Sequence, residues 1–207
     1  MKLIPTKTPT VVKKMFPNYI WNFPTDDKIL YLTFDDGPTP EITNWTLDIL
    51  NSFNAKATFF CIGNNVDKHP DIFKNILDNG HRIGNHTHHH LKGWNVKTKP
   101  YLNDIEIASN FINSNLFRPP YGKLKTKQAK AIIQLKYKII MWDVLSFDWD
   151  HTITNEQCYN GVISKAKNGS IIVFHDSIKA ENNMKYTLPK VLKYFSEKGY
   201  QFKSIDF

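Results

Sequence analysis

The sequence is poor in cysteine, has no long apolar stretch and lacks repeats, and these shortages exclude several classes of protein. Only Cys61 and Cys158 occur among its 207 residues, far apart in the chain, so neither a disulfide framework nor a thiolate zinc site is indicated. No apolar run approaches the roughly 18 residues of a membrane helix. Because 41% of the residues are hydrophobic and 22% are charged, the composition matches a globular domain rather than a disordered or fibrous chain.

The sequence also lacks a concentration of charge. Basic residues outnumber acidic ones by 27 to 19, which gives a net charge of +8, but the lysines are scattered along the chain. A nucleic-acid partner predicts a basic stripe interleaved with exposed aromatic residues, and the sequence shows none. We therefore expect no nucleic-acid partner and interpret the charge as a generally basic surface.

The N-terminal segment carries lysines but has no continuous apolar core of about 7–15 residues and no small-residue cleavage site, so no signal peptide is indicated. By sequence the chain is expected in the cytoplasm, unless it is exported by another route or has been separated from a leader. Residues 1–24 are interpreted as an N-terminal arm and residues 25–207 as one domain, a size that suits a single core. We expect a monomer.

Strand and helix patterns alternate from residue 29 to the C-terminus. Residues 170–174 are apolar on both faces, which is typical of a strand in a parallel sheet covered by helices. An open doubly wound sheet and a closed barrel both fit this alternation. The predicted strands are residues 29–34, 57–62, 81–85, 116–118, 138–144, 170–176 and 200–205, and the predicted helices are residues 41–53, 70–79, 102–112, 126–136, 155–167 and 188–198.

Polar residues gather where these strands end. In a parallel barrel the C-terminal ends of all strands lie on one rim, where such folds place their active sites. Residues far apart in the sequence are therefore expected to meet in space. The residues concerned are Asp35, Asp36, His86, His90, Arg118, Asp143, Asp148, His175 and Asp176.

Three of these residues suit a metal ion. His86 and His90, four positions apart, supply together with Asp36 the nitrogen and oxygen ligands of a catalytic zinc site that keeps one position for water. Zinc is expected first, although cobalt, nickel and iron accept the same donors. Taken alone, Asp35 and Asp36 are equally consistent with a turn in which an aspartate bonds its own backbone, and the histidines with a solvated surface cluster.

Other residues point to acid–base chemistry and to sugar binding. Arg118 is expected to pair with one of the carboxylates at the rim, which would lower the pKa of that carboxyl and fix its orientation. His175 follows four apolar residues, so it is either an acid or base at the edge of a dry core or a hydrogen-bonded core histidine. Trp142, Phe147 and Trp149 offer aromatic faces that support sugar rings or line an apolar pocket.

These residues stand in five motifs that resemble those of the polysaccharide deacetylases, also called NodB-like proteins or family 4 carbohydrate esterases. The motifs are Thr33–Gly37, His86–His90, Arg118–Gly122, Asp148–Trp149 and Val173–His175, in the order and spacing of that family. The resemblance covers about residues 28–207. It implies an α/β fold, a distorted (β/α) barrel with about seven parallel strands, and thus favours the barrel over the open sheet.

The resemblance implies roles for the residues on the metal side of the site. Asp36, His86 and His90 would hold the divalent metal. Asp35 would be the general base that takes a proton from the attacking water, and Arg118 would orient it.

On the opposite side, the resemblance assigns His175 as the general acid for the leaving amine and Asp148 as the partner of its ring. The backbone N–H of Tyr121 would help to stabilise the oxyanion. The family usually has leucine where Val173 stands, so a slightly larger acetyl pocket is expected. The substrate-binding residues implied are Trp149, Val173, Tyr121 and Pro120.

The implied activity is hydrolysis of the acetamide of N-acetylglucosamine-type residues in a poly- or oligosaccharide, such as peptidoglycan or a chitooligosaccharide, with release of acetate. An O-acetyl esterase acting on xylan-type polymers is the close alternative. A non-haem iron oxygenase also uses two histidines and one carboxylate, but it would leave Asp35, Arg118 and His175 without a task. A sugar-binding protein that has lost catalysis would not need both a base and an acid. By resemblance, the chain acts in the cell envelope or outside the cell.

Overall fold

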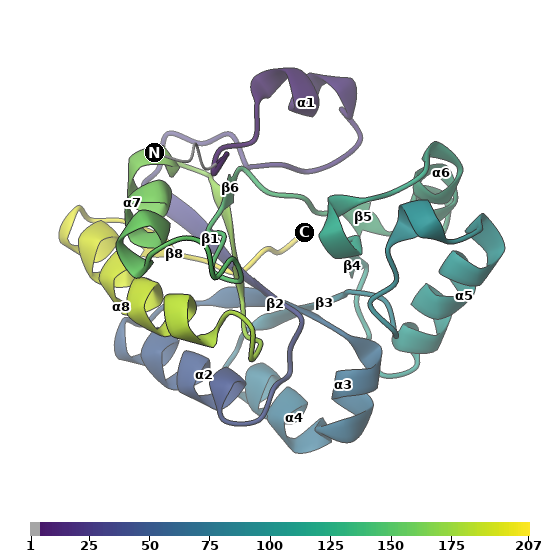
Figure 1. Ribbon diagram of the computed structural model, residues 1–207, viewed down its shortest axis with the longest axis horizontal. Coiled ribbons are helices and arrows are strands. Elements are labelled where there is room, and N and C mark those ends of the chain that lie inside the picture. Colours follow the sequence, from purple (N-terminus) through teal and green to yellow (C-terminus); the bar gives the residue numbers. More distant parts are fainter. Residues whose placement is uncertain (1–4) are drawn as a thin grey trace.

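The computed structural model describes residues 5–207 and shows one curled parallel sheet wrapped by helices (Figure 1). Seven strands follow one another in the order β5-β4-β3-β2-β1-β7-β6, with parallel pairing throughout, and β8 pairs with the start of β1. The predicted distorted barrel is confirmed as a curled half-barrel. The strands are β1 (Ile29–Asp35), β2 (Ala57–Cys61), β3 (Arg82–Asn85), β4 (Leu116–Phe117), β5 (Lys138–Ile139), β6 (Val144–Leu145), β7 (Ile171–His175) and β8 (Gln201–Phe202).

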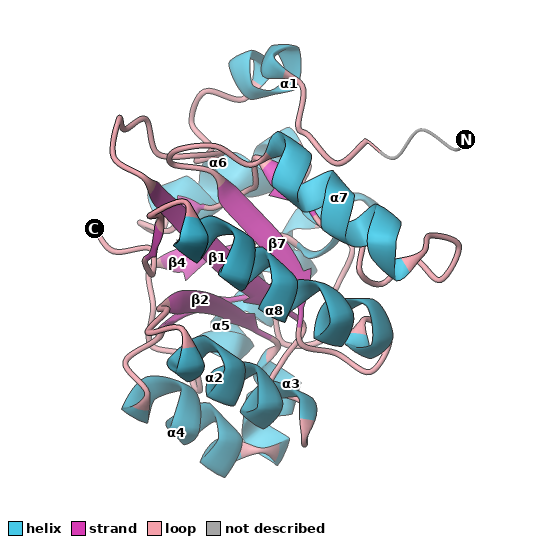
Figure 2. Cartoon of the chain, turned by 90° about the vertical axis from the view of Figure 1, so that its left-hand side faces the viewer, coloured by secondary structure: helices cyan, strands magenta, loops and turns pink. Residues whose placement is uncertain are grey.

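Helices surround the sheet, with α2, α3 and α4 below it in Figure 1, α7 and α8 on the left, and α5 and α6 on the right. Figure 2 shows α7 and α8 lying across the β1–β7 side. Within residues 5–207, no helix combines the length and the apolar character needed to span a membrane. The helices are α1 (Thr10–Met15), α2 (Ile42–Ser52), α3 (Gly63–Lys68), α4 (Pro70–Asp78), α5 (Thr98–Ser109), α6 (Thr126–Gln134), α7 (Asn155–Lys165) and α8 (Glu181–Glu197), with short 3₁₀ turns η1 (Gly93–Asn95) and η2 (Pro120–Gly122).

The structure differs from the sequence prediction mainly at residues 138–144, which do not form a single strand. β5 pairs with β4 at one edge of the sheet and β6 pairs with β7 at the other edge, so the chain between them crosses the open side of the barrel. The predicted last strand is shorter than expected and pairs only with the first residues of β1. Two helices, α1 and α3, were not predicted, because each has only six residues and buries few side chains.

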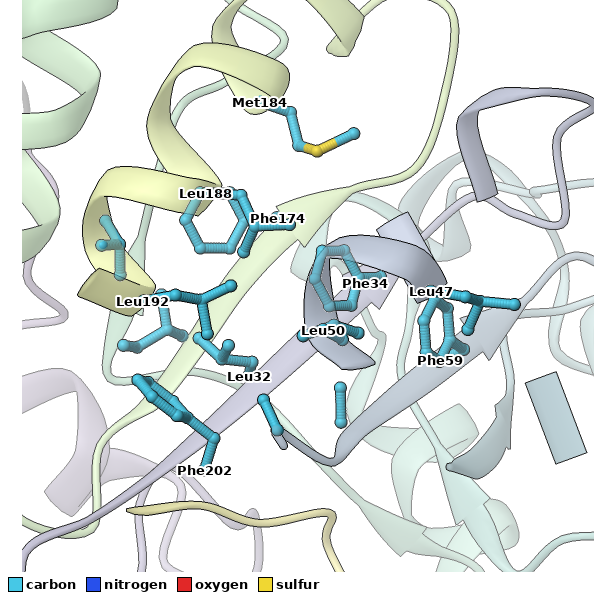
Figure 3. Packing of buried hydrophobic residues seen from close by; sticks show 14 of the residues in the cluster. Leu32, Phe34, Leu47, Leu50, Phe59, Phe174, Met184, Leu188, Leu192 and Phe202 are labelled. Carbon is cyan, nitrogen blue, oxygen red and sulfur yellow. The ribbon is translucent and has the colours of Figure 1, made fainter. Parts of the chain in front are cut away.

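The main core lies between the sheet and the helices α2 and α8 (Figure 3). Phe34 of β1 stands in register with Phe59 of β2 and with Phe174 of β7. The three rings are fully buried, with centroids 5.0 Å apart for Phe34 and Phe59 and 6.0 Å apart for Phe34 and Phe174. Leu50 and Leu188 pack against this row of rings from the two helices. Burial of each large side chain stabilises the fold by about 1.5–3 kcal/mol.

Because side chains alternate along a strand, the residues next to this row point into the barrel instead. Asp35 follows Phe34 and stands in register with His175 of β7. The same register that builds the helix-facing core thus places a carboxylate and an imidazole side by side at the strand ends.

The N-terminal arm packs along the open side of the barrel. Lys7 pairs with Val144 in an antiparallel bridge, and Ile20 pairs with Ile140 in a parallel one. The buried carboxylate of Asp143 accepts hydrogen bonds from the ammonium groups of Lys7, at 2.5 Å, and Lys13. Residues 1–4 of the predicted arm lie outside the described residues, and the boundary between arm and domain at residues 24 and 25 stays a prediction.

Candidate active site

The ends of β1 and β3 bring together three potential metal ligands. Asp36, with φ of 80°, directs its Oδ1 to within 3.2 Å of His90 Nε2 and 3.6 Å of His86 Nε2. All three ligand atoms lie within 4.8 Å of one another. Burial alone would raise the pKa of Asp36. Its hydrogen bond with His90 and the nearby imidazoles of His175 and His86 have the larger, opposite effect, so the pKa lies below its usual value and the carboxyl stays ionised.

The orientation of His86 is fixed from behind. Its Nδ1 lies 2.7 Å from the carbonyl oxygen of Arg118. A carbonyl only accepts hydrogen bonds, so Nδ1 carries the proton and Nε2 presents a lone pair toward Asp36. Burial of the His86 ring lowers its pKa to about 4, which keeps the imidazole in the neutral form that a metal requires.

The loop between the two histidines is held by a carboxylate from another element. Asp104 of α5 is buried, and its Oδ2 accepts the backbone N–H groups of His88 at 2.9 Å and His89 at 3.0 Å. Its Oδ1 also lies 2.6 Å from His89 Nδ1. On the other side, Asn85 Oδ1 accepts the N–H of Thr87 at 2.8 Å. These contacts hold a loop in which Thr87, with φ of 64°, has a left-handed backbone.

Asp35 is paired with a fully buried arginine. Arg118 Nη1 donates to Asp35 Oδ1 at 2.7 Å and to the hydroxyl of Thr33 at 2.7 Å. Its Nε and Nη2 donate to the carbonyls of Ile140 and Met141. Since each nitrogen of the guanidinium has an acceptor, the arginine is rigid and holds one oxygen of Asp35 in place.

His175 forms a second pair on the opposite side. Its Nδ1 lies 2.8 Å from Asp148 Oδ1, and its backbone N–H donates to Asp148 Oδ2 at 2.7 Å. Burial alone would lower the pKa of His175, but the charge of Asp148 and the hydrogen bond to it raise the pKa to about 9. The imidazole is therefore protonated at neutral pH, as an acid for a leaving group must be. Trp149 packs edge-on against it, with ring centroids 4.7 Å apart.

The turn that carries Asp35 and Asp36 is braced by Asp176. Its buried carboxylate accepts the N–H of Gly37 at 3.2 Å and the hydroxyl of Thr43 at 2.5 Å. Burial raises the pKa of Asp176 to about 8. A Cβ added to Gly37 would stand 2.0 Å from Asp176 Oδ2, so only glycine fits this turn.

The candidate metal ligands, Asp35 and His175 surround one open cavity of about 330 Å³. The volume suits a small group such as one sugar ring with its substituents. Its lining residues are Asp35, Asp36, His86, His90, Pro119, Tyr121, Trp142, Leu145, Trp149, Val173, His175, Ser177 and Lys179.

Comparison with known proteins places this geometry in a family. Residues 22–140 match the family model described as polysaccharide deacetylase. A peptidoglycan-N-acetylglucosamine deacetylase of Bacillus cereus is 34% identical over 192 residues, which cover 89% of this chain and 90% of that protein. The chain belongs to the polysaccharide deacetylase family. It is accordingly a hydrolase that deacetylates carbohydrates.

Other members of the polysaccharide deacetylase family extend the likeness. Chitin deacetylase 2 of Saccharomyces cerevisiae is 31% identical over 172 residues, covering 77% of this chain and 54% of that protein. The crystal structure of a peptidoglycan N-acetylglucosamine deacetylase in complex with a substituted N-oxidanyl-benzamide superposes with a TM-score of 0.86, at 32% identity, over 96% of this chain and 95% of that one.

In this polysaccharide deacetylase, most of the residues predicted from the sequence meet at the cavity. Arg118 and Asp148 stand behind it and contact Asp35 and His175. Pro120 does not line the cavity: it is buried, and its neighbour Pro119 faces the cavity instead. The predicted metal ligands, base, acid and substrate-binding residues that line it are Asp36, His86, His90, Asp35, His175, Tyr121, Trp149 and Val173.

Sequence reasoning missed residues of two kinds. Ser177 and Lys179 line the cavity, and their position directly after β7 was the available signal. Asp104 reaches the histidine loop from the middle of a helix, where nothing in the sequence distinguishes it from a surface carboxylate. Asp176 was noted at a strand end, but its contact with Gly37 depends on how the turn folds.

Proposed function

We propose that this chain is a metal-dependent N-deacetylase that hydrolyses the acetamide of N-acetylglucosamine-type residues in a poly- or oligosaccharide and releases acetate. One observation carries the proposal. Asp35, which is paired with Arg118, and His175, which is paired with Asp148, face the same cavity. The two-histidine, one-carboxylate donor set lines that cavity as well. The B. cereus relative is named for the same reaction on peptidoglycan.

The donors of the candidate metal site suit a divalent ion. Asp36, His86 and His90 offer one oxygen and two nitrogen ligand atoms close enough to share one ion, and this set is typical of catalytic zinc. Because His86 Nδ1 donates a hydrogen bond to the carbonyl oxygen of Arg118, the other ring nitrogen is unprotonated and can bind the metal ion. When bound, a divalent ion would activate water and polarise the acetamide carbonyl. Zinc is the first choice, and cobalt or nickel would accept the same ligands.

Asp35 acts as the general base. One of its oxygens is held by Arg118 at 2.7 Å, so the carboxylate keeps a fixed orientation while the other oxygen accepts a proton from the attacking water.

His175 acts as the general acid. The carboxylate of Asp148 fixes its Nδ1 at 2.8 Å, so the other ring nitrogen donates its proton to the amine as the bond to the acetyl carbon breaks. An amine leaves poorly unless it is protonated, which is why this site needs an imidazolium opposite the base.

The remaining residues position the substrate. Tyr121 has a left-handed backbone with φ of 58°, and its N–H donates to the oxyanion of the tetrahedral intermediate, a contribution of about 3–4 kcal/mol for donors of this type. Trp149 and Val173 form the wall against which the acetyl methyl packs, since both line the cavity on the side of His175.

Two variants test the proposal with distinct readouts. Asp35→Asn should keep its metal, measured by elemental analysis after dialysis, and lose about 100-fold or more of the acetate release. His86→Ala should lose the metal itself. Asp71→Asn on the surface of α4 and His69→Ala before that helix are the matched controls.

The substrate panel consists of peptidoglycan fragments, chitooligosaccharides and acetylated xylan. Acetate from the first two with little from xylan supports N-deacetylation. Full activity of Asp35→Asn would disprove the base assignment, and a normal metal content in His86→Ala would disprove the donor set.

A further inference from the structure

Lysines that are scattered in the sequence come together beside the active-site cavity. Two segments carry them, residues 92–97 before α5 and residues 123–125 before α6. These segments are packed together: Gln128 Nε2 donates to the carbonyl of Gly93 at 2.9 Å, and Lys125 Nζ donates to the carbonyl of Val96 at 2.8 Å. A Cβ on Gly93 would stand 2.4 Å from the carbonyl oxygen of Lys123. We call Lys92, Lys97, Lys123 and Lys125 the lysine shelf.

The lysine shelf is continuous with the cavity through two exposed aromatic rings. Tyr121, 59% exposed, lines the cavity with its ring centroid 4.8 Å from that of His90, and the Lys92 ammonium lies 5.7 Å from the Tyr121 centroid. Trp94, 54% exposed, has the Lys123 ammonium 4.3 Å from its ring centroid. Its indole N–H donates to a backbone carbonyl at 3.0 Å, which fixes the ring. Aromatic faces of this kind support sugar rings.

No acidic side chain among residues 5–207 forms an ion pair with the four lysines of the shelf, whereas lysines elsewhere, such as Lys74 and Lys185, have carboxylate partners. Asp104 lies nearby in sequence, but its carboxylate is already occupied by the histidine loop. The positive charge of the shelf is therefore not neutralised by the protein.

The shelf also stands where lysine is unfavourable for the fold. Lys97 is the N-cap residue of α5 and Lys125 is the N-cap residue of α6, and the first turn of each helix lacks an acidic residue. Helix N-termini favour negative charge and Asp, Asn, Ser or Thr caps. The two helix ends therefore add their positive partial charge to that of the lysines. A negatively charged ligand would relieve this repulsion.

We propose that the lysine shelf binds carboxylates of an anionic N-acetylated glycan strand, one of whose acetamides lies in the cavity. This rests on the proposed function and names its substrate class: a glycan that bears acidic substituents, rather than a neutral chitin chain. We expect a strand bound in the cavity to continue over Tyr121 toward Trp94, because the exposed Tyr121 ring lines the cavity and the exposed Trp94 ring lies under Lys123, two residues further along the chain. A nucleic acid would satisfy the lysines but has no acetamide for the cavity.

The reaction itself then changes the affinity of the shelf for the strand. Water adds to the acetamide, acetate leaves, and the neutral nitrogen becomes an amine that is protonated near neutral pH. Each removed acetyl group thus adds one positive charge to the glycan, which the lysine shelf repels. Strands that are already deacetylated should bind more weakly than the intact strand.

The test compares a shelf variant with a matched control. Lys92→Gln/Lys123→Gln removes two charges that lie over aromatic rings beside the cavity. Lys190→Gln/Lys198→Gln removes two charges that lie over tyrosine rings of α8, with distances of 4.4 Å and 4.7 Å to the centroids. Acetate release is measured on an oligosaccharide that bears muramyl peptides and on chitotetraose, at low and physiological salt.

For the shelf variant, we expect the ratio of the KM for the anionic oligosaccharide to the KM for chitotetraose to rise about fivefold, the size of two solvent-exposed charge contacts. The control should leave that ratio unchanged. In the parent protein, raising the salt should increase the KM for the anionic substrate, because exposed charges are screened. Calorimetric titration of the muramyl-peptide oligosaccharide into the same variants combined with Asp35→Asn gives the same comparison with little turnover.

The outcomes separate the two proposals. Acetate from both substrates with an equal KM ratio in the shelf variant and the control would overturn the role of the shelf and leave the deacetylase intact. No acetate from any substrate would disprove the proposed function, while the calorimetric comparison still decides the role of the shelf. If a single-stranded oligonucleotide displaces the anionic glycan at equal charge and lower concentration, the shelf is a nucleic-acid site and the proposal is wrong.

Discussion

The pair of His175 and Asp148 predicts the pH range in which the enzyme works. Asp148 contacts the ring with one oxygen and the backbone N–H of His175 with the other, at 2.8 Å and 2.7 Å. Asp148→Asn keeps the shape and one acceptor but removes the negative charge. Burial alone lowers the pKa of His175, and the negative charge of Asp148 does most to raise it. The variant should therefore have an imidazole that loses its proton below neutral pH.

The magnitude follows from the pKa, which is raised from 6.5 to about 9 in the intact pair. At pH 8, about nine-tenths of the parent enzyme carries the protonated acid, against about 3% if the pKa returns to 6.5. We expect kcat/KM of Asp148→Asn to fall at least about 30-fold at pH 8 and less than about twofold at pH 6 through protonation alone. Lost positioning of the ring would add a loss that is the same at every pH.

The assay is acetate release as a function of pH, with Asp71→Asn as a surface control. The parent should lose activity as the pH rises through about 9, and the alkaline limb of Asp148→Asn should move to lower pH. Stability should follow the same sign, because a pKa raised on folding stabilises the native state below the unfolded value and ceases to do so above the folded one. An alkaline limb that stays near pH 9 in the variant would refute this account of the acid.

Three further variants test other parts of the structure. Asp104→Ala should weaken metal binding about 10–100-fold, as measured by competition with a chelator. The variant removes the hydrogen bonds that hold the histidine loop but keeps all three proposed ligand residues. An unchanged affinity would show that the loop keeps its conformation without Asp104. Asp143→Asn should lower the free energy of unfolding in urea at pH 7 and have little effect at low pH. Burial raises the pKa of Asp143, but its hydrogen bonds to Lys13 and Lys7 lower it by more, so the stabilisation from the carboxylate is lost as the pH falls. Equal destabilisation at both pH values would contradict the ion pairing. Phe34→Ala should lower the free energy of unfolding by about 3–5 kcal/mol, and a loss below about 1 kcal/mol would mean that its ring row is not the centre of the core.

The features that the sequence predicted best are those that depend on strand order alone. Asp35, His86 and His175 directly follow or end predicted strands, and parallel strands bring their C-terminal ends to one rim. Their convergence at one cavity is confirmed by the structure, although their roles stay proposals. The pairing of Arg118 with a carboxylate was also predicted from its position, and the structure identifies the carboxylate as that of Asp35.

The features that the sequence did not predict depend on contacts across the fold. Residues 138–144 have the composition of one strand, but the curvature of the sheet takes their two ends to opposite edges. Asp104 looks like any polar residue on a helix until the histidine loop folds over it. The lysine shelf could not be predicted for the same reason. Lys92 and Lys123 lie far apart in the chain, and their segments come together only because η1 packs on the segment before α6.

The register of β1 couples the stability of this protein to its chemistry. Phe34 and Asp35 are adjacent, so one faces the helices and the other faces the barrel. Through the same register, Phe34 meets Phe174 and Asp35 meets His175 on β7. If one of the two strands slipped by one residue, its core phenylalanine and its proposed catalytic residue would both point to the wrong face of the sheet. The buried aromatic row that makes such a slip costly therefore also fixes the spacing between the proposed base and the proposed acid.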